Sequence, residues 1–154
     1  DFKINLDSWD GYPAERMKIA NIIRDNSLEN VIFVTGDTHS SWAFEVSLDP
    51  VDNYGKENEA FAIEFGTTSI NSSNSDERYP KDTVLAHEKR IVNSPVNPHL
   101  KYANLRDHGY LVLTLSEEAA KAEWYYVESV VKKTDVENLG KTISIPSGST
   151  KIAL

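Results

Sequence analysis

Apolar residues follow a helical period near the start of the chain and a strand pattern directly after it. Beyond Pro13 they recur every three or four positions, which predicts a helix over residues 13–25 with one face against a core. Residues 31–36 then form a run rich in β-branched side chains, which predicts a strand buried on both faces of a parallel or mixed sheet. A helix followed by such a strand is typical of the α/β fold class.

Shorter strand patterns dominate the rest of the chain. They lie at residues 42–48, 60–65, 110–115 and 122–127. The last two predict a hairpin across Ser116-Glu117-Glu118. From residue 132 onward we expect a polar tail with a late strand at 142–145.

A long connection separates the second and third of these strand patterns. Residues 66–82 are rich in Ser, Thr, Asn and Asp and predict a surface loop, which a short helix at 83–93 follows. Residues 94–98 are expected to be extended, because the residue before a proline disfavours helix. A connection of this length is uncommon in a compact domain unless it forms a lid or the wall of a site.

Composition narrows the function classes. A length of 154 residues suits one domain with a real core. The net charge of −8 argues against a nucleic-acid partner, because phosphate contacts need clustered Lys and Arg. No apolar run is long enough to span a membrane, and the absence of Cys excludes disulfides and thiolate ligands. The chain starts without Met and reads as the interior of a larger protein.

The turn that follows residues 31–35 carries candidate metal ligands. Gly36 allows a sharp turn, and Asp37 and His39 then offer an oxygen and an imidazole nitrogen. Ligands bind preferentially where strands of such sheets end, which favours a metal site here. A polar turn with a hydrogen-bonded histidine is the alternative.

Two further histidines lie in the long connection. His99 and His108 belong to one loop system that could fold over the strand end at Asp37, and a surface position is the alternative for both. For His87 we expect the surface position. Glu64, at a strand end, is expected to be a buried hydrogen-bond partner rather than a base.

Several motifs occur in one characteristic order along residues 7–127. They are Asp7-x-Trp9-Asp10-Gly11-Tyr12-Pro13-Ala14-x-Arg16, Thr35-Gly36-Asp37-x-His39-Ser40, Glu64-Phe65-x-Thr67-x-Ser69, Asn97-Pro98-His99-Leu100-Lys101-Tyr102 and Gly109-Tyr110. This succession resembles the C-terminal half of the PhoD-type alkaline phosphatases, a branch of the calcineurin-like metallophosphoesterases.

The resemblance implies a fold and an activity. It implies a four-layer α/β sandwich of which only the C-terminal half is present, with residues 1–131 as part of the phosphatase domain and 132–154 as the tail. It also implies a metal cluster of iron and calcium, with zinc or manganese as alternatives. Such a cluster activates water for hydrolysis of a small-molecule phosphate monoester or diester. Periplasmic location or secretion is implied by the family alone.

The resemblance also assigns roles to single residues. It makes Asp37 and His39 metal ligands, and His39 and His99 candidate catalytic residues. Candidate substrate-binding residues are Asn97, Asp10 and Tyr12. Structural roles stay open for Asn97 and His99, and ordinary helix-entry chemistry stays open for the segment 10–13.

The upstream metal-binding segments of the family are not found in this sequence. We therefore expect a partial catalytic domain that is inactive or nearly so by itself, and that exposes a sheet edge where the missing N-terminal half pairs. Two other readings stay open. One is a non-catalytic β-rich binding module, and the other is a metallophosphoesterase that acts on nucleotides or phospholipids.

Overall fold

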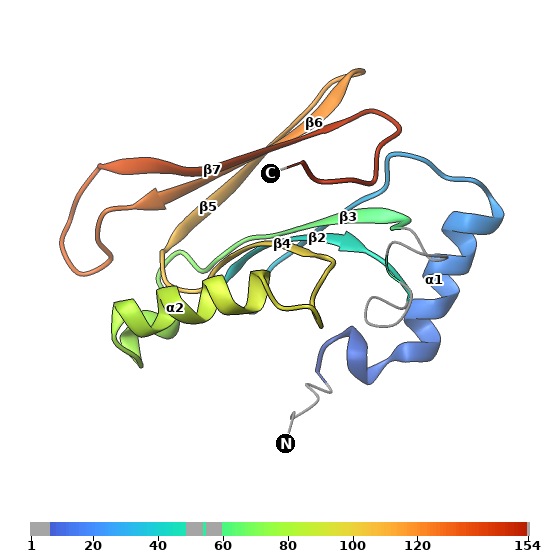
Figure 1. The fold of residues 1–154 in the computed structure, drawn as a ribbon. Helices are drawn as coiled ribbons and strands as arrows, with labels where there is room; N and C mark the ends of the chain where they lie inside the picture. Colours follow the sequence, from blue (N-terminus) through green and yellow to red (C-terminus); the bar gives the residue numbers. More distant parts are fainter. Residues whose placement is uncertain (1–6, 49–53, 55–59, 154) are drawn as a thin grey trace.

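The computed structural model describes residues 7–48, 54 and 60–153. Its elements run along the chain from blue to red in Figure 1. The helices are the 3₁₀ turns η1 (Trp9–Gly11) and η2 (Ser75–Glu77) and the α-helices α1 (Pro13–Asp25) and α2 (Lys81–Val92). The strands are β1 (Ile32–Thr35), β2 (Ser41–Val46), β3 (Ala62–Gly66), β4 (Leu100–Asn104), β5 (Gly109–Leu115), β6 (Ala119–Val127) and β7 (Glu137–Pro146).

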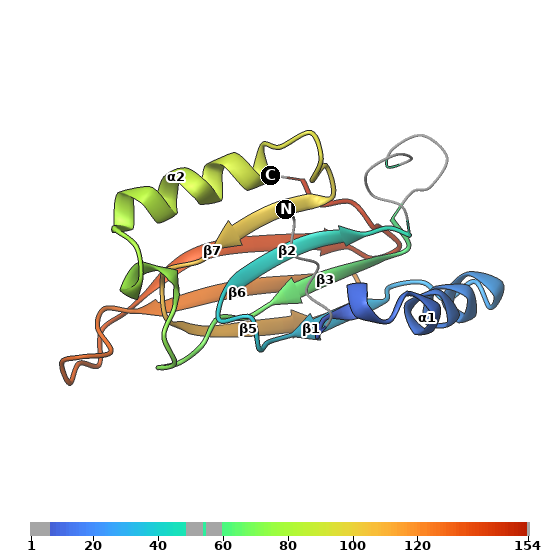
Figure 2. The ribbon, with the colours of Figure 1, turned by 90° about the horizontal axis from the view of Figure 1, so that it is seen from below.

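The strands form two sheets that lie against each other. A four-stranded sheet has the order β1-β3-β2-β4, and a three-stranded sheet has the order β5-β6-β7. β1 is parallel to β3 and the other pairs are antiparallel, so the first sheet is mixed, as expected. Both α-helices flank the face of the first sheet that points away from the second (Figures 1 and 2). The described residues therefore form a mixed α/β arrangement of two sheets and one layer of helices.

The core lies between the two sheets. Its buried members are Ala43, Ile63, Phe65, Ala122, Trp124, Tyr126, Ile143, Ile145 and Ile152. Trp124 is fully buried, and its indole N–H donates to the carbonyl of Gly66 at 2.9 Å, which ties the second sheet to the first. The hydroxyls of Tyr102 and Tyr126 make a second link at 2.7 Å.

The strand expected to be buried on both faces is only partly buried, and it lies at the edge of the first sheet. β1 contacts β3 alone in the sheet order, and Val34 is 57% exposed. The apolar run at 31–36 predicts that the strand is buried. It does not identify the segment that buries it. The free backbone groups of β1 are able to pair with a further strand.

The late strand expected at 142–145 exists and is longer than expected. β7 has ten residues and pairs with β6 along almost its whole length. Ile143 and Ile145 point into the core while Thr142 and Ser144 alternate with them, which is the two-residue period of a half-buried strand. Part of the expected polar tail therefore belongs to the second sheet.

The extended segment expected at 94–98 was a wrong prediction. Two successive turns replace it, closed by hydrogen bonds from Asn97 N to Ser94 O at 2.9 Å and from Leu100 N to Asn97 O at 3.0 Å. Pro95 and Pro98 each occupy the second position of a turn, where their fixed φ is favourable.

The predicted helices and the predicted hairpin are confirmed, whereas β4 was not predicted and the loop expected at the surface buries Asn74. α1 has the expected bounds, α2 begins two residues before the expected helix, and β5 and β6 form the expected hairpin. In the described part of the chain, none of the helices combines the length and apolar character needed to cross a bilayer.

Candidate metal-binding turn

Strand direction brings three loops to one end of the first sheet. β1 and β3 are parallel and end side by side at Thr35 and Gly66. β4 ends at Asn104, which lies opposite Ser41 at the start of β2. The turn at 36–40, the loop at 67–78 and the loop at 105–108 therefore meet at the same edge, which is where ligands bind in many sheets of this kind.

The backbone of the 36–40 turn is strained. Asp37 has a φ of 71°, and Thr38 N donates to Gly36 O at 2.9 Å, which is a γ-turn of the rare hand. His39 also has a positive φ, of 53°. Such conformations cost about 1–3 kcal/mol each and cluster at functional sites. Asp37 is exposed, so its carboxylate is accessible to a ligand.

A backbone hydrogen bond fixes the imidazole of His39. Its Nδ1 lies 2.9 Å from the carbonyl oxygen of Ser73. A carbonyl only accepts hydrogen bonds, so Nδ1 carries the proton and the neutral ring keeps its lone pair on Nε2. The indole N–H of Trp42 donates to Thr38 Oγ1 at 2.9 Å and holds the turn onto β2. A hydrogen bond from one ring nitrogen to a backbone carbonyl, as between His39 and Ser73, is the arrangement that orients a metal-ligating histidine.

Asn74 holds the loop that carries Ser73. Its side chain is buried, with the residue 2% exposed. Its amide nitrogen donates to Thr68 Oγ1 at 3.0 Å and to the carbonyls of Arg106 and Asp107 at 3.3 and 3.2 Å. Asn74 therefore ties the loop at 67–78 to the loop at 105–108.

His108 strengthens the same connection. It is 7% exposed, its Nδ1 lies 3.1 Å from Ser69 Oγ, and its Nε2 lies 3.1 Å from a carboxylate oxygen of Glu77. Ser69 Oγ also donates to Asn74 Oδ1 at 2.7 Å. Asn74 and His108 are buried, and together with the partly buried Ser69 and the exposed Glu77 they fix the position from which Ser73 contacts His39.

Replacement of Asn74 by alanine is expected to loosen this loop. The change removes the partner of buried carbonyls and frees the Ser73 carbonyl from His39. We expect a loss of about 1–3 kcal/mol in the free energy of unfolding and a roughly 10- to 100-fold loss in metal affinity. Thermal unfolding and metal titration of the complete gene product measure both. The exposed Asn71→Ala in the same loop is the matched control. A folded Asn74→Ala variant with unchanged metal affinity would contradict the role given to this residue.

Tyr12 and Asp10 belong to the entry of α1. Tyr12 is 57% exposed, and its carbonyl accepts from Glu15 N and Arg16 N at 3.1 and 3.0 Å. It precedes Pro13 at the first helical position. The side chain of Asp10 lies outside the described residues. The backbone contacts fit helix-entry chemistry, and contact of Asp10 or Tyr12 with a substrate stays a prediction.

The structure does not bring His99 and Asn97 to Asp37 and His39. Both precede β4, at the strand end opposite Asn104. The His99 ring stacks on Phe44 at 5.5 Å and lines a separate hollow of about 310 Å³. The side-chain amide of Asn97 donates to the carbonyl of Ile91 near the end of α2 at 3.3 Å. Their catalytic and substrate-binding roles stay predictions.

Glu64 is a hydrogen-bond partner, as expected, although it is partly rather than fully buried. Thr35 Oγ1 donates to its carboxylate at 2.7 Å, from the neighbouring strand β1. Sequence reasoning missed Asn74, because it lies in a loop where most residues are Ser, Thr, Asn or Asp. Ser69 belongs to one of the ordered motifs, but no role was assigned to it there.

The donor set at the turn fits a metal in part. The Asp37 carboxylate and the His39 nitrogen suit hard or borderline cations. Within the described residues, no group of three or more His, Cys, Asp and Glu side chains lies close enough to hold an ion. A complete site would therefore take ligands from beyond these residues.

Three comparisons with known proteins agree on one family. A sequence model of the family described as PhoD-like phosphatase matches residues 1–124. The chain is 36% identical over 123 residues to alkaline phosphatase D of Bacillus subtilis (strain 168), an alignment that covers 78% of this chain and 19% of that protein. A solved structure titled "Structure of PhoD" matches with a TM-score of 0.71 and 28% identity, over 96% of this chain and 26% of that chain. The chain thus spans about a fifth of the curated relative's length.

Proposed function

The chain belongs to the PhoD-like phosphatase family, and on that premise we propose that it supplies part of the active site of a metal-dependent phosphate ester hydrolase. The observation that carries this proposal is the His39–Ser73 hydrogen bond. It leaves the Nε2 lone pair of His39 free at the turn that also presents the Asp37 carboxylate. An oxygen and a nitrogen ligand two residues apart are thereby prepared for one cation or two adjacent ones.

Each residue then has a defined task. Asp37 and His39 hold the metal centre, Ser73 orients His39, and Trp42 keeps the turn at the strand end. A metal ion there supplies a Lewis acid for the phosphate oxygens and an activated water. The mixed oxygen and nitrogen donors are compatible with iron and calcium, with zinc or manganese as alternatives.

The remaining ligands come from other parts of the same catalytic domain. The chain carries two candidates, so we expect it to be inactive or nearly so by itself. The free edge of β1 offers a place where a further strand of the domain pairs. We also propose that the complete catalytic domain is a four-layer α/β sandwich of which this chain is the C-terminal half. The proposed bounds of the phosphatase part are residues 1–131; in residues 132–154, which follow it, β7 completes the second sheet.

The proposed substrates are small-molecule phosphate monoesters or diesters, and the proposed location is the periplasm or the exterior of the cell. Family membership supports both. Action on nucleotides or phospholipids is the alternative within the metallophosphoesterases, and a non-catalytic β-rich module is the alternative outside them.

Removal of metal from the complete gene product tests the proposal. We expect hydrolysis of p-nitrophenyl phosphate or of bis(p-nitrophenyl) phosphate to disappear after chelation and to return when iron and calcium are added. Zinc and manganese are tested in parallel, and a buffer-only incubation is the control. Activity that survives complete metal removal would contradict metal dependence. Absence of activity under every metal condition would favour the non-catalytic module.

A further inference from the structure

A polar hollow of about 190 Å³ lies directly beside His39. Its lining includes His39, Ser40, Ser73, Ser75, Arg78 and Tyr79. No Asp or Glu of the described residues lines it. In a chain with a net charge of −8, a hollow with a guanidinium, several hydroxyls and no carboxylate suits an anion.

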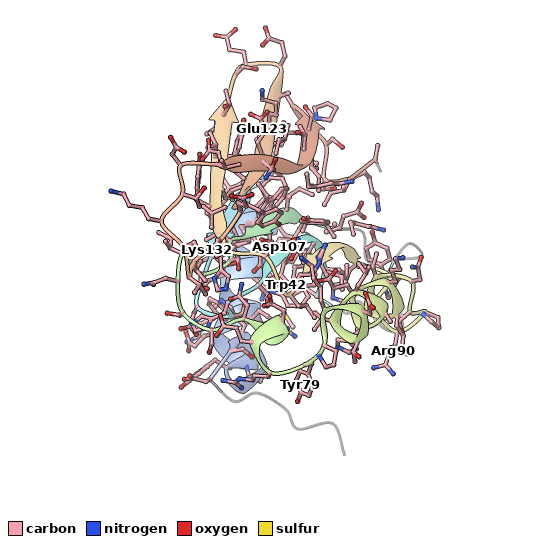
Figure 3. All side chains as sticks on the ribbon, turned by 90° about the vertical axis from the view of Figure 1, so that its left-hand side faces the viewer. Trp42, Tyr79, Arg90, Asp107, Glu123 and Lys132 are labelled. Atoms are coloured by element: carbon pink, nitrogen blue, oxygen red, sulfur yellow. The ribbon has the colours of Figure 1, made fainter. Side chains whose placement is uncertain are left out.

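A larger groove continues from this hollow along α2. Its volume is about 540 Å³, and it shares Ser75 and Tyr79 with the hollow beside His39. Thr83, His87 and Arg90 line it from α2 at spacings of four and three residues, so one face of the helix forms its wall. Figure 3 shows Tyr79 and Arg90 on the same side of the molecule, opposite Glu123 of the second sheet.

The groove, like the hollow, is lined by hydrogen-bond donors and by no carboxylate of the described residues. Arg90 donates to Nδ1 of His87 at 2.9 Å, because a guanidinium has no acceptor, and the neutral His87 ring then carries its proton on Nε2. Glu88, the next residue on α2, is buried on the other side. Its carboxylate accepts from Leu105 N at 2.7 Å and pairs with Arg106 at 3.1 Å. The Glu88 carboxylate is thus paired with other groups, and neither it nor the exposed Asp82 in the first turn of α2 lines the groove.

The acidic residues of the preceding loop, Asp76 and Glu77, lie outside the lining of both the hollow and the groove. Glu77 pairs with His108 at 3.1 Å. Arg78 and Tyr79 are both exposed, so a ligand can reach the guanidinium and the phenol ring. Tyr79 lines both the hollow, together with Arg78, and the groove, together with Arg90.

We propose that the hollow and the groove bind the leaving-group side of a phosphate ester that carries a second phosphate. Arg78 contacts the second phosphate, Tyr79 contacts the organic part between the phosphates, and Arg90 extends the positive surface for longer oligophosphate esters. The inference rests on the proposed function, because the first phosphate is placed at Asp37 and His39. A hydrogen bond from a guanidinium to a phosphate is charge-assisted, which makes Arg78 the residue that selects such substrates.

Two substrates that differ by one phosphate test the inference. AMP and adenosine 3′,5′-bisphosphate share a 5′-phosphate, and the second has a phosphate on its leaving group. For the complete gene product loaded with metal, we expect KM of the 5′-phosphate hydrolysis to be about tenfold lower for the bisphosphate. Arg78→Ala should remove this difference by raising KM for the bisphosphate alone. Lys89→Ala, an exposed cation on α2 outside the groove lining, should change neither.

The outcomes separate this inference from the proposed function. Equal effects of Arg78→Ala on both substrates, or no effect on either, would overturn the inference while hydrolysis itself continues. If the protein hydrolyses neither substrate, calorimetric measurement of adenosine 3′,5′-bisphosphate binding decides whether the anion site exists. Binding that Arg78→Ala weakens supports the anion site although the proposed function fails, and binding that is absent or independent of Arg78 overturns the inference.

Discussion

Substitution of Asp37 by alanine in the complete gene product is expected to lower kcat/KM for p-nitrophenyl phosphate about a thousandfold, which corresponds to about 4 kcal/mol. The carboxylate is exposed at the strand end, and in the proposed role it supplies charge and an oxygen ligand to the metal. Metal content should fall in the same variant. Steady-state kinetics together with elemental analysis of the purified protein measure both effects.

Two matched variants separate ligation from the shape of the turn. Asp37→Gly also lacks the carboxylate but accommodates the φ of 71° without strain, so it should lose activity as Asp37→Ala does while unfolding at a higher temperature than that variant. Asp25→Ala removes an exposed aspartate at the end of α1 and should leave activity unchanged. If Asp37→Gly retains activity, Asp37 has a structural role and is not a ligand.

The largest expected effect on stability comes from Trp124. Replacement by alanine is expected to lower the free energy of unfolding by about 3–5 kcal/mol. The side chain is fully buried between the sheets, packs its ring edge-on against Phe65 at 5.6 Å, and donates to the Gly66 carbonyl. Its removal leaves a cavity and a buried carbonyl without its donor. Thermal and denaturant unfolding of the complete gene product test this value.

Two other aromatic substitutions calibrate the result. Trp124→Phe keeps most of the apolar contact and loses the indole N–H, so its cost should lie well below that of alanine. Trp9→Ala removes a side chain that is 47% exposed and should cost less than about 1 kcal/mol. If Trp124→Ala is no more destabilising than Trp9→Ala, the sheet-to-sheet core is not the main source of stability.

The elements that the sequence predicts well are those with local signals. The helix at 13–25 has a proline at its first position and an apolar period, and the hairpin of β5 and β6 has two alternating runs around a polar turn. The failures have tertiary causes. The position of β1 at the edge depends on the sheet order, and the burial of its faces depends on what packs against the sheet. The two turns at 94–100 depend on where the chain must go after α2.

The candidate site likewise contains residues that the sequence predicts and residues that only the structure reveals. The Gly-Asp-x-His spacing points to Asp37 and His39 because it follows directly from a strand end. The hydrogen bond that orients His39 is not visible in the sequence, because its acceptor is a backbone carbonyl 34 residues away. Asn74 and Arg78 are equally hidden, since only the parallel pairing of β1 and β3 brings their loop to the turn.

The most direct test of the central claim is the crystal structure of the complete gene product grown with its metals, with anomalous data to locate them. The account predicts metal ions about 2.0–2.6 Å from a carboxylate oxygen of Asp37 and about 2.0–2.2 Å from Nε2 of His39, with Nδ1 still on the Ser73 carbonyl. A loaded metal centre that contacts neither Asp37 nor His39 would contradict it.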